Sequence, residues 1–179
     1  MLSYSSTGVE LSDKPRFAYF SRVVPPDNLQ AKAMALLVDR LEWNYVHAIA
    51  DTGSYGERGM DSFRAAATER GICIDGDIHK ISRRWTDDQF EELIIRMRHS
   101  NKARGVVMFV DEDNLRRFLT NLKRMISNGS YPELKNYFWF IASDSWGMKT
   151  SVIKGFEQIV NGAITIAPKV RFLKGESTK

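Results

Sequence analysis

The amino-acid sequence predicts an α/β domain built on a doubly wound, mostly parallel sheet. Short apolar segments of strand length alternate along the chain with longer segments whose apolar residues recur at helical spacing. The strand segments are apolar at consecutive positions, which is typical of strands that helices cover on both faces. The chain has 179 residues, of which 43% are hydrophobic, so one globular domain can bury a sizeable core.

The first half of the chain shows three strand segments and two helical ones. Aromatic and β-branched residues dominate the first strand, which Pro25-Pro26 ends in a sharp turn. The first helix has Pro26 at its entrance, and its predicted buried face consists of Leu29, Ala33, Leu36, Leu37 and Leu41. The expected elements are a strand over 17–24, a helix over 27–41, a strand over 45–50, a loop over 51–59, a helix over 60–71 that ends at a glycine, and a strand over 72–78.

The second half continues the alternation. Thr86 is placed to cap a helix, because it precedes Asp87 and Asp88, whose charges favour the positive end of a helix. The predicted buried residues of the last two long helices are Phe90, Leu93, Ile94 and Met97, and then Leu115, Phe118, Leu119, Leu122 and Ile126. The expected elements are a helix after Thr86, a strand over 105–110, a helix from Asp113, a strand over 137–142, a short helix over 149–160 and a strand over 163–166.

Composition excludes several functional classes. The net charge is +4, but acidic residues interrupt the basic ones throughout, so no nucleic-acid partner is expected. The sequence shows neither a secretory signal nor an apolar run of about 18 residues, so as written it has no route to a membrane. By composition alone, the single Cys73 is a buried structural thiol in a reducing compartment. One sequon, Asn128-Gly129-Ser130, would permit glycosylation of a secreted chain.

Acidic residues gather where strands are expected to end. In a parallel sheet, ligands bind beyond the carboxyl ends of the strands. Each acid alone also fits a helix cap, because Asp and Ser are common at strand-to-helix junctions. Several acids and a tyrosine on one edge nevertheless favour a site for a cationic group, held by carboxylates and an aromatic face. The residues concerned are Asp27, Asp51 with Tyr55, Asp111 with Glu112 and Asp113, and Ser143 with Asp144, Ser145 and Trp146.

Patterns typical of enzymes are incomplete. The glycines after the second strand lack the spacing of a phosphate-binding loop, so a tight turn is expected there. The segment 143–147 is similar to a nucleophile elbow with Ser145 as nucleophile, but Ser143 replaces its first glycine, and only His79 could reach it as a base. One cysteine and scattered histidines predict no metal site, and no cofactor is expected. A small α/β hydrolase that uses Ser145 stays as the alternative from another class.

Six segments form a specific set of motifs. They are Ser5 to Thr7 with Glu10 to Asp13, FSRVVPPD at 20–27, Gln30-Ala31 with Ala33-Met34, WNYV at 43–46, GSYGE at 53–57, and SDSWG at 143–147. Together they resemble the extracellular ligand-binding domain of metabotropic glutamate receptors, which are class C G-protein-coupled receptors. The DSWG-x-K form at 144–149 is most similar to group II and III members. The resemblance extends over about residues 3–169 and implies a periplasmic-binding-protein-like lobe, the second lobe of a Venus flytrap.

The resemblance implies three parts of the chain and a function. Residues 1–14 would be an interlobe crossing with a ligand-contact loop, residues 15–162 would be lobe two, and residues 163–179 would be a hinge strand returning to a missing lobe one. The implied function is non-enzymatic: the lobe closes on L-glutamate and thereby triggers signalling by a full-length receptor at the plasma membrane, on its extracellular side. Another amino acid as ligand, or a decoy fragment that binds none, stays open.

The resemblance also implies residue roles and partners. The residues that would hold the ligand's α-amino and α-carboxylate groups are Thr7 and the backbone near Ser5 and Ser6. Asp27 and Asp144 would face the ammonium group and Tyr55 would stack on it, whereas Lys149 would lie near the distal carboxylate. More weakly, Asp111 and Glu112 would belong to a loop that contributes to the cleft. Cys73 would form a disulfide with a missing cysteine-rich domain. The other implied partners are lobe one, a second receptor copy in a homodimer, and a G protein reached through a missing transmembrane domain.

Overall fold

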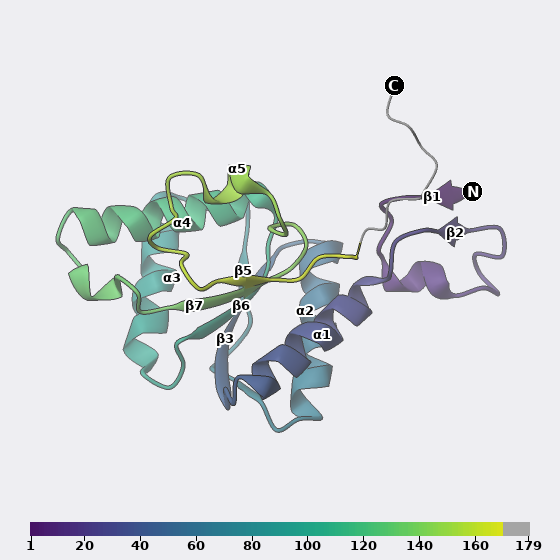
Figure 1. Cartoon of the computed structure of the whole chain (residues 1–179), viewed down its shortest axis with the longest axis horizontal. Coiled ribbons are helices and arrows are strands. Elements are labelled where there is room, and N and C mark those ends of the chain that lie inside the picture. Colours follow the sequence, from purple (N-terminus) through teal and green to yellow (C-terminus); the bar gives the residue numbers. More distant parts are fainter. Residues whose placement is uncertain (170–179) are drawn as a thin grey trace.

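A computed structural model describes residues 1–169 and shows a central parallel sheet with helices on both sides (Figure 1). Its strands are β3 (Tyr45–Asp51), β4 (Cys73–Ile74), β5 (His79–Ile81), β6 (Gly105–Phe109), β7 (Trp139–Ala142) and β8 (Ile164–Thr165). Its helices are α1 (Asp27–Arg40), α2 (Ser54–Thr68), α3 (Asp87–Ser100), α4 (Glu112–Ser127) and α5 (Thr150–Ile153). The strand order is β4, β3, β6, β7, β8, with β5 also on β3, and every pair is parallel. The predicted fold class is therefore confirmed.

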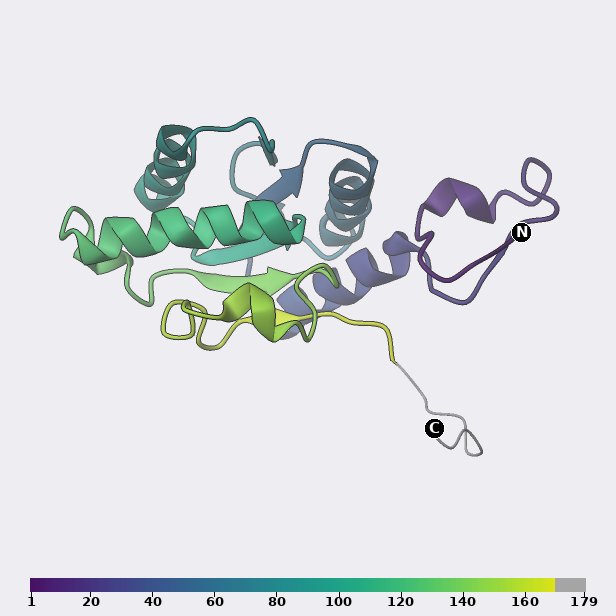
Figure 2. The same cartoon turned by 90° about the horizontal axis from the view of Figure 1, so that it is seen from above.

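The side chains of the central strands alternate between two apolar cores. Val107 and Phe109 of β6 enter the core that is shared with α1 and α2. Val106 and Met108 of the same strand enter the opposite core, which is shared with α3 and α4. This alternation follows from the two-residue period of a strand and produces the doubly wound arrangement seen from above in Figure 2.

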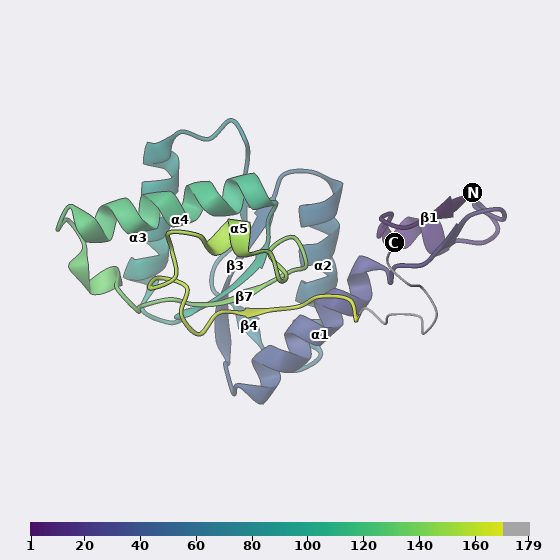
Figure 3. The ribbon, with the colours of Figure 1, turned by 45° about the horizontal axis from the view of Figure 1, so that its top comes forward.

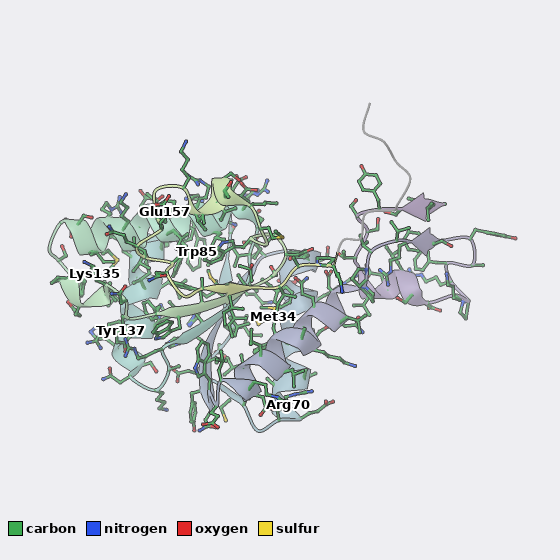
Figure 4. The ribbon with its side chains drawn as sticks, viewed as in Figure 1. Met34, Arg70, Trp85, Lys135, Tyr137 and Glu157 are labelled. Carbon is green, nitrogen blue, oxygen red and sulfur yellow. The ribbon has the colours of Figure 1, made fainter. Side chains whose placement is uncertain are left out.

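Helix α1 begins at the predicted residue but buries a different face. The expected inward residues Leu29 and Leu36 are 52% and 46% exposed, so the predicted face is wrong. The buried residues are instead Ala31, Met34, Ala35 and Val38, and Figure 4 labels Met34 on this helix. The physical reason is the packing of α1 against α2, because small alanine side chains allow two helices to approach closely.

Helix α2 begins at Ser54, before the predicted start, so the loop predicted over 51–59 is wrong. Only Thr52 and Gly53 separate β3 from this helix, and Gly53 supplies a φ of +122° at the junction. Gly56 lies inside the helix, where a Cβ atom would approach to 2.6 Å from the Asp51 backbone nitrogen. The early start places Tyr55 in the first turn of α2, at the carboxyl edge of the sheet.

Three further elements are shorter than predicted. The strand over 17–24 is reduced to β2 (Ser21–Arg22), because the strand that it pairs with among residues 1–169, β1 (Leu2–Ser3), has only two residues. Within the strand predicted over 72–78 only β4 forms; Gly76 follows it with a φ of +73°, and β5 begins beyond the predicted range, at His79. The helix over 149–160 is limited to the single turn α5, which is followed by Gly155 at a φ of +87°. The cap at Thr86 is confirmed, since its side chain and that of Gln89 form a capping box.

The N-terminal segment extends away from the sheet, beyond the start of α1 (Figures 1 and 3). It contains β1, β2 and the short 3-10 helix η1 (Val9–Ser12). Arg22 stabilises it by donating hydrogen bonds of 3.2 Å and 2.7 Å to the carbonyl oxygens of Ser6 and Gly8. The domain limits drawn from the resemblance stay a prediction, and the last part of the implied hinge strand, 170–179, lies outside the described residues.

Two histidines that are held in the neutral form predict a loss of stability in acid. His47 is 1% exposed, and burial lowers its pKa. Burial also lowers the pKa of His79 to about 4, and the nearby charges of His47 and Arg96 lower it further. Since the unfolded value is about 6.5, this contribution to stability is complete above about pH 6.5 and is lost as the pH falls towards about 4. Urea unfolding should therefore show a lower midpoint within this range than at neutral pH. His79→Gln should reduce the difference, and an equal difference in the natural and His79→Gln proteins would contradict the assignment.

Candidate functional site

The acidic residue that opens α1 is buried with one oxygen unpaired. Asp27 is 4% exposed, and its backbone nitrogen donates to the carbonyl oxygen of Thr7 at 3.0 Å. Its carboxylate oxygen Oδ1 is buried and has no hydrogen-bond partner within residues 1–169. Burial raises the pKa of Asp27, the Thr7 hydroxyl lowers it in part, and the nearby Asp144 raises it again. A cation beside this oxygen would remove the cost of leaving it unpaired.

Two side chains fix the second acid, Asp144, which follows β7. The Tyr55 hydroxyl donates to Asp144 Oδ1 at 2.8 Å and lies 2.9 Å from Ser143 Oγ. Gln30 donates from Nε2 to the same Oδ1 at 3.3 Å, while its Oε1 accepts from the Asp144 backbone nitrogen at 2.6 Å. Burial, followed by the Asp144 charge, raises the pKa of Tyr55, so this phenol remains a donor at physiological pH. The carboxylate is therefore held in one orientation.

Gln30 contacts Asp144 twice, although the sequence alone assigns it no role. Its position could have suggested one, because Gln30 follows Asp27 by three residues and so lies on the same side of α1. A glutamine is seldom singled out from sequence, since its amide serves equally well on any solvated surface. The structure shows that α1 approaches the loop after β7, where the side-chain nitrogen and oxygen of Gln30 both form hydrogen bonds with Asp144.

A cavity of about 360 Å³ joins the two acids to the N-terminal segment and to the chain after β8. The predicted site residues that line it are Ser5, Thr7, Asp27 and Asp144. Its other lining residues include the polar Tyr4 and Gln30 and the apolar Val24, Pro25, Pro26, Leu29, Ala33, Ile166, Ala167 and Pro168. Tyr55 does not line the cavity but is hydrogen-bonded to Asp144, which does. Ser6 does not line it either, and its hydroxyl accepts a hydrogen bond from Ser3 Oγ at 2.7 Å within the N-terminal segment. The cavity therefore pairs an acidic wall with an apolar one.

Lys149 lies apart from this cavity. Its Nζ is 3.3 Å from Glu112 Oε2, and the Ser151 hydroxyl donates to Glu112 Oε1 at 3.1 Å. Both members of the ion pair are partly exposed, with 52% of the Lys149 side chain and 36% of the Glu112 side chain accessible. The predicted residues thus form two groups, an acidic group around Asp27 and Asp144 and a Lys149–Glu112 pair.

The remaining acids at this edge have structural roles. Asp111 caps α4, because its Oδ1 accepts from the Asn114 backbone nitrogen at 2.8 Å, and its Oδ2 pairs with Arg83 at 2.8 Å. Asp51 is 8% exposed and accepts from Asn114 Nδ2 at 2.8 Å and from the Asp111 backbone nitrogen. Burial raises the pKa of Asp51, and these two donors lower it in part. Both acids therefore fix the loop that carries Glu112.

The arrangement does not support hydrolase chemistry. Ser145 Oγ donates to the Val110 carbonyl oxygen and lies 3.0 Å from Ser143 Oγ. His79 packs beside His47 instead, with ring centroids 6.5 Å apart, and lines a cavity with Asp75 and Arg96. Across residues 1–169 no cluster of three potential metal ligands is found, and none of the described helices is long and apolar enough to cross a membrane.

Cys73 is exposed, so the composition-based expectation of a buried thiol is wrong. It opens β4, whose two residues pair with the first two residues of β3. Because β4 is a two-residue strand at the edge of the sheet, the Cys73 side chain remains in contact with solvent. The thiol is therefore accessible at the end of the sheet opposite to Asp27 and Asp144, which leaves the predicted external disulfide sterically open.

Comparison with known proteins agrees with the motifs. Residues 1–172 match the family model described as the receptor family ligand binding region. The chain is 42% identical over 175 residues to metabotropic glutamate receptor 8 of Homo sapiens, 40% to metabotropic glutamate receptor 4 of Rattus norvegicus, and 42% to metabotropic glutamate receptor 6 of Oryctolagus cuniculus. Each alignment covers 97% of this chain, but the chain spans only 18–19% of the length of these relatives.

These matches confirm the resemblance to metabotropic glutamate receptors and the periplasmic-binding-protein-like fold that it implied. The relatives are receptors and not enzymes, so the non-enzymatic interpretation is confirmed and the Ser145 hydrolase is excluded. The family model covers nearly the whole chain, from the N-terminal segment to the residues after β8. The chain therefore belongs to the receptor family ligand binding region, the family of receptor ectodomains that contains the ligand-binding part of its metabotropic relatives.

Proposed function

We propose that this chain is the second lobe of an amino-acid-binding receptor domain and that it binds the α-ammonium group of L-glutamate. The observation that carries the proposal is the buried, unpartnered Oδ1 of Asp27 beside a cavity that Asp144 also lines. An ammonium group offers three donors and a positive charge, which suit two carboxylates better than any neutral ligand does. The similarity to metabotropic glutamate receptors favours glutamate among the amino acids.

Each site residue has a proposed role in this complex. The Thr7 hydroxyl and the backbone near Ser5 and Ser6 hold the α-amino and α-carboxylate groups. Asp27 and Asp144 pair with the ammonium, and Tyr55 presents its ring to it while its hydroxyl orients Asp144. Lys149 takes the distal carboxylate, for which it exchanges its exposed contact with Glu112. That exchange costs little, because an exposed ion pair contributes about 0–1 kcal/mol.

The wider context is part of the same proposal. Residues 1–14 and the chain after β8 cross to lobe one, and closure of the two lobes on the ligand triggers signalling. The receptor acts as a homodimer in the plasma membrane, with this lobe on the extracellular side, and its transmembrane domain contacts the G protein. The exposed Cys73 forms a disulfide with the cysteine-rich domain.

The chain by itself should respond to glutamate only weakly. It offers one wall of the site, and an open ammonium subsite must order the ligand with few water-excluded contacts. The affinity should be millimolar or weaker, which is about −4 kcal/mol at best. Two-dimensional NMR of the labelled chain should show amide shifts at Thr7, Asp27 and Asp144 with L-glutamate. N-acetyl-L-glutamate is the control, because it keeps both carboxylates but lacks the ammonium; equal shifts with both compounds would refute the ammonium site.

Lys149→Ala should change ligand preference more than overall affinity. In a two-lobed domain that contains this chain, the substitution should weaken glutamate binding by about 1 kcal/mol and should leave alanine or serine binding almost unchanged. The reason is that only glutamate has a second carboxylate. Titration calorimetry with the three amino acids measures the difference, and Lys154→Ala is a control at a nearby lysine that lines no part of the site. An equal loss for all three ligands would place Lys149 outside the pocket.

A further inference from the structure

The turn between β4 and β5 forms one wall of a second cavity. Both strands pair with β3, and the turn leaves the sheet between them at Gly76, whose φ is +73°. This cavity has a volume of about 290 Å³, and the second half of α3 forms another of its walls. It shares no lining residue with the cavity of Asp27 and Asp144. Its charged and polar lining residues are His47, Asp75, Asp77, His79, Arg96 and Ser100.

His47 lines this cavity from β3 and has one unpaired ring nitrogen. The side chain is 1% exposed, and Nε2 donates to the Ala103 carbonyl oxygen at 3.2 Å. Because a carbonyl oxygen can only accept, Nε2 carries the proton of the neutral ring, and Nδ1 then has a free lone pair. Nδ1 is buried and has no hydrogen-bond partner within residues 1–169. This arrangement is typical of a metal-bound histidine, which donates its other ring N–H to a carbonyl or carboxylate oxygen.

Asp75 lies opposite this lone pair. Its Oδ2 is 3.6 Å from His47 Nδ1, and the same oxygen accepts from the Ser100 hydroxyl of α3. The carboxylate oxygen and the lone pair are both acceptors, so a cation in contact with both would satisfy the pair. Two ligand atoms on one tetrahedral zinc ion, with bonds of about 2.0–2.2 Å, lie about 3.4 Å apart. The two side chains are therefore almost at the separation that such an ion requires.

The charges around the cavity favour a cation. Asp75 and Asp77 contribute two carboxylates, and Asp77 is exposed, which gives an ion a path from solvent. The positive charge of Arg96, which also lines the cavity, is paired with Glu92 at 2.9 Å. The negative charges therefore exceed the positive ones at this site.

His79 is positioned as a third ligand. Its ring centroid is 6.5 Å from that of His47, whereas two imidazoles on one zinc ion have centroids no more than about 6.4 Å apart. His79 must therefore come slightly closer to His47, and it directly follows the turn that begins with Asp75. This agrees with the finding that, among residues 1–169, three potential ligands do not already meet at one point.

We propose that His47 Nδ1 and Asp75 Oδ2 bind a divalent ion of the zinc type, with His79 as the third ligand and water as the fourth. A set of imidazole nitrogens and a carboxylate suits zinc, whereas calcium needs six to eight oxygen ligands. The ion would join β3 to the turn and, through Ser100, to α3, so it would stabilise the fold. The sequence predicts no metal site because His47 and His79 are 32 positions apart, and only the pairing of β4 and β5 with β3 brings them together.

The first test is calorimetric titration of the chain with zinc chloride. Cys73→Ser serves as the background, because the exposed thiol would itself bind zinc. One zinc ion should bind per chain, a chelator should remove it, and calcium chloride should give no binding. Asp75→Asn should lower the zinc affinity at least about tenfold, a loss that even an outer partner of a ligand produces, and His79→Asn should also lower it. His99→Gln is the matched control, because His99 is exposed and lines neither cavity.

The second test needs no substitution at the buried histidine. Long-range proton–nitrogen NMR of the labelled histidine rings should show that zinc shifts the Nδ1 resonance of His47, while Nε2 keeps the proton that it donates to Ala103. Zinc should also raise the midpoint of urea unfolding in the natural chain, and should have no such effect in the Asp75→Asn chain.

Three results would overturn the inference. They are the absence of binding up to millimolar zinc, binding that survives Asp75→Asn at full affinity, and a resonance shift confined to His99. The last two would identify the ion as an adventitious ion only. The outcome is also separable from the proposed function, because the two cavities share no residue: zinc should bind equally well with and without L-glutamate.

Discussion

Asp27→Asn is expected to stabilise the unliganded chain while it weakens glutamate binding in a two-lobed domain. Burial raises the pKa of Asp27, which means that its charged form is less favourable in the folded state than in the unfolded one. Above the raised pKa the carboxylate therefore reduces stability, and the penalty disappears as the pH falls below the unfolded value of 3.8. The neutral amide should raise the free energy of unfolding at neutral pH by about 1 kcal/mol.

The same substitution should weaken binding by about 2 kcal/mol, a loss of about thirtyfold, because the ammonium loses one charged acceptor. Urea unfolding of the chain and calorimetry on the two-lobed domain give the two values. The matched control is Asp61→Asn, at an exposed position of α2, which should change neither. Two results would contradict the role of Asp27: unchanged glutamate affinity, or a decrease in stability at neutral pH.

The order of elements could be predicted from the sequence because it depends on local periodicity. The strands β3, β6 and β7 are nearly continuous apolar runs, and α3 and α4 carry regular buried stripes. The acidic group could also be predicted, because parallel strands bring their carboxyl ends to one edge. Asp27 and Asp144 are 117 positions apart in the sequence, but the topology of the sheet places both beside one cavity.

The buried face of α1 could not be predicted, because two faces of that helix are apolar. Leu29 and Leu36 favour one face by hydrophobicity, whereas Ala31 and Ala35 lie on the other and are fully buried. The deciding factor is how closely α2 approaches, and that distance is a property of the packed pair and not of either sequence. The start of α2 could not be predicted for a related reason, since Gly56 is typical of a loop and only the neighbouring Asp51 backbone explains a glycine inside the helix.

The hydrogen-bond partners of individual polar side chains could not be predicted from the sequence either. Asp111 and Asp144 both follow buried strands, yet the first caps α4 and the second is held by Tyr55 and Gln30. The sequence gives both the same local pattern. The difference arises from which side chains neighbouring elements supply, so only the structure separates a helix cap from a residue that borders the cavity.

Gly56→Ala is expected to lower the free energy of unfolding by about 2 kcal/mol, although alanine normally favours a helix over glycine by about 1 kcal/mol. The new Cβ would lie 2.6 Å from the Asp51 backbone nitrogen, and a strand backbone cannot move aside as a flexible side chain can. The first turn of α2 must therefore shift away from β3. Because Tyr55 precedes Gly56, its hydroxyl should move off Asp144, and the pKa of Tyr55 should fall back towards its ordinary value.

Urea unfolding measures the first effect, and titration of the Tyr55 ring in selectively labelled protein measures the second. The matched control is Arg64→Ala, which introduces the same residue at an exposed position of the same helix and should be close to neutral. Tyr55→Phe identifies the tyrosine resonance, since it removes the titrating hydroxyl and keeps the ring. A Gly56→Ala chain that is as stable as the natural one, with an unchanged Tyr55 titration, would show that α2 does not depend on close contact with β3. The position of Tyr55 would then have to be set by its hydrogen bonds to Ser143 and Asp144 alone.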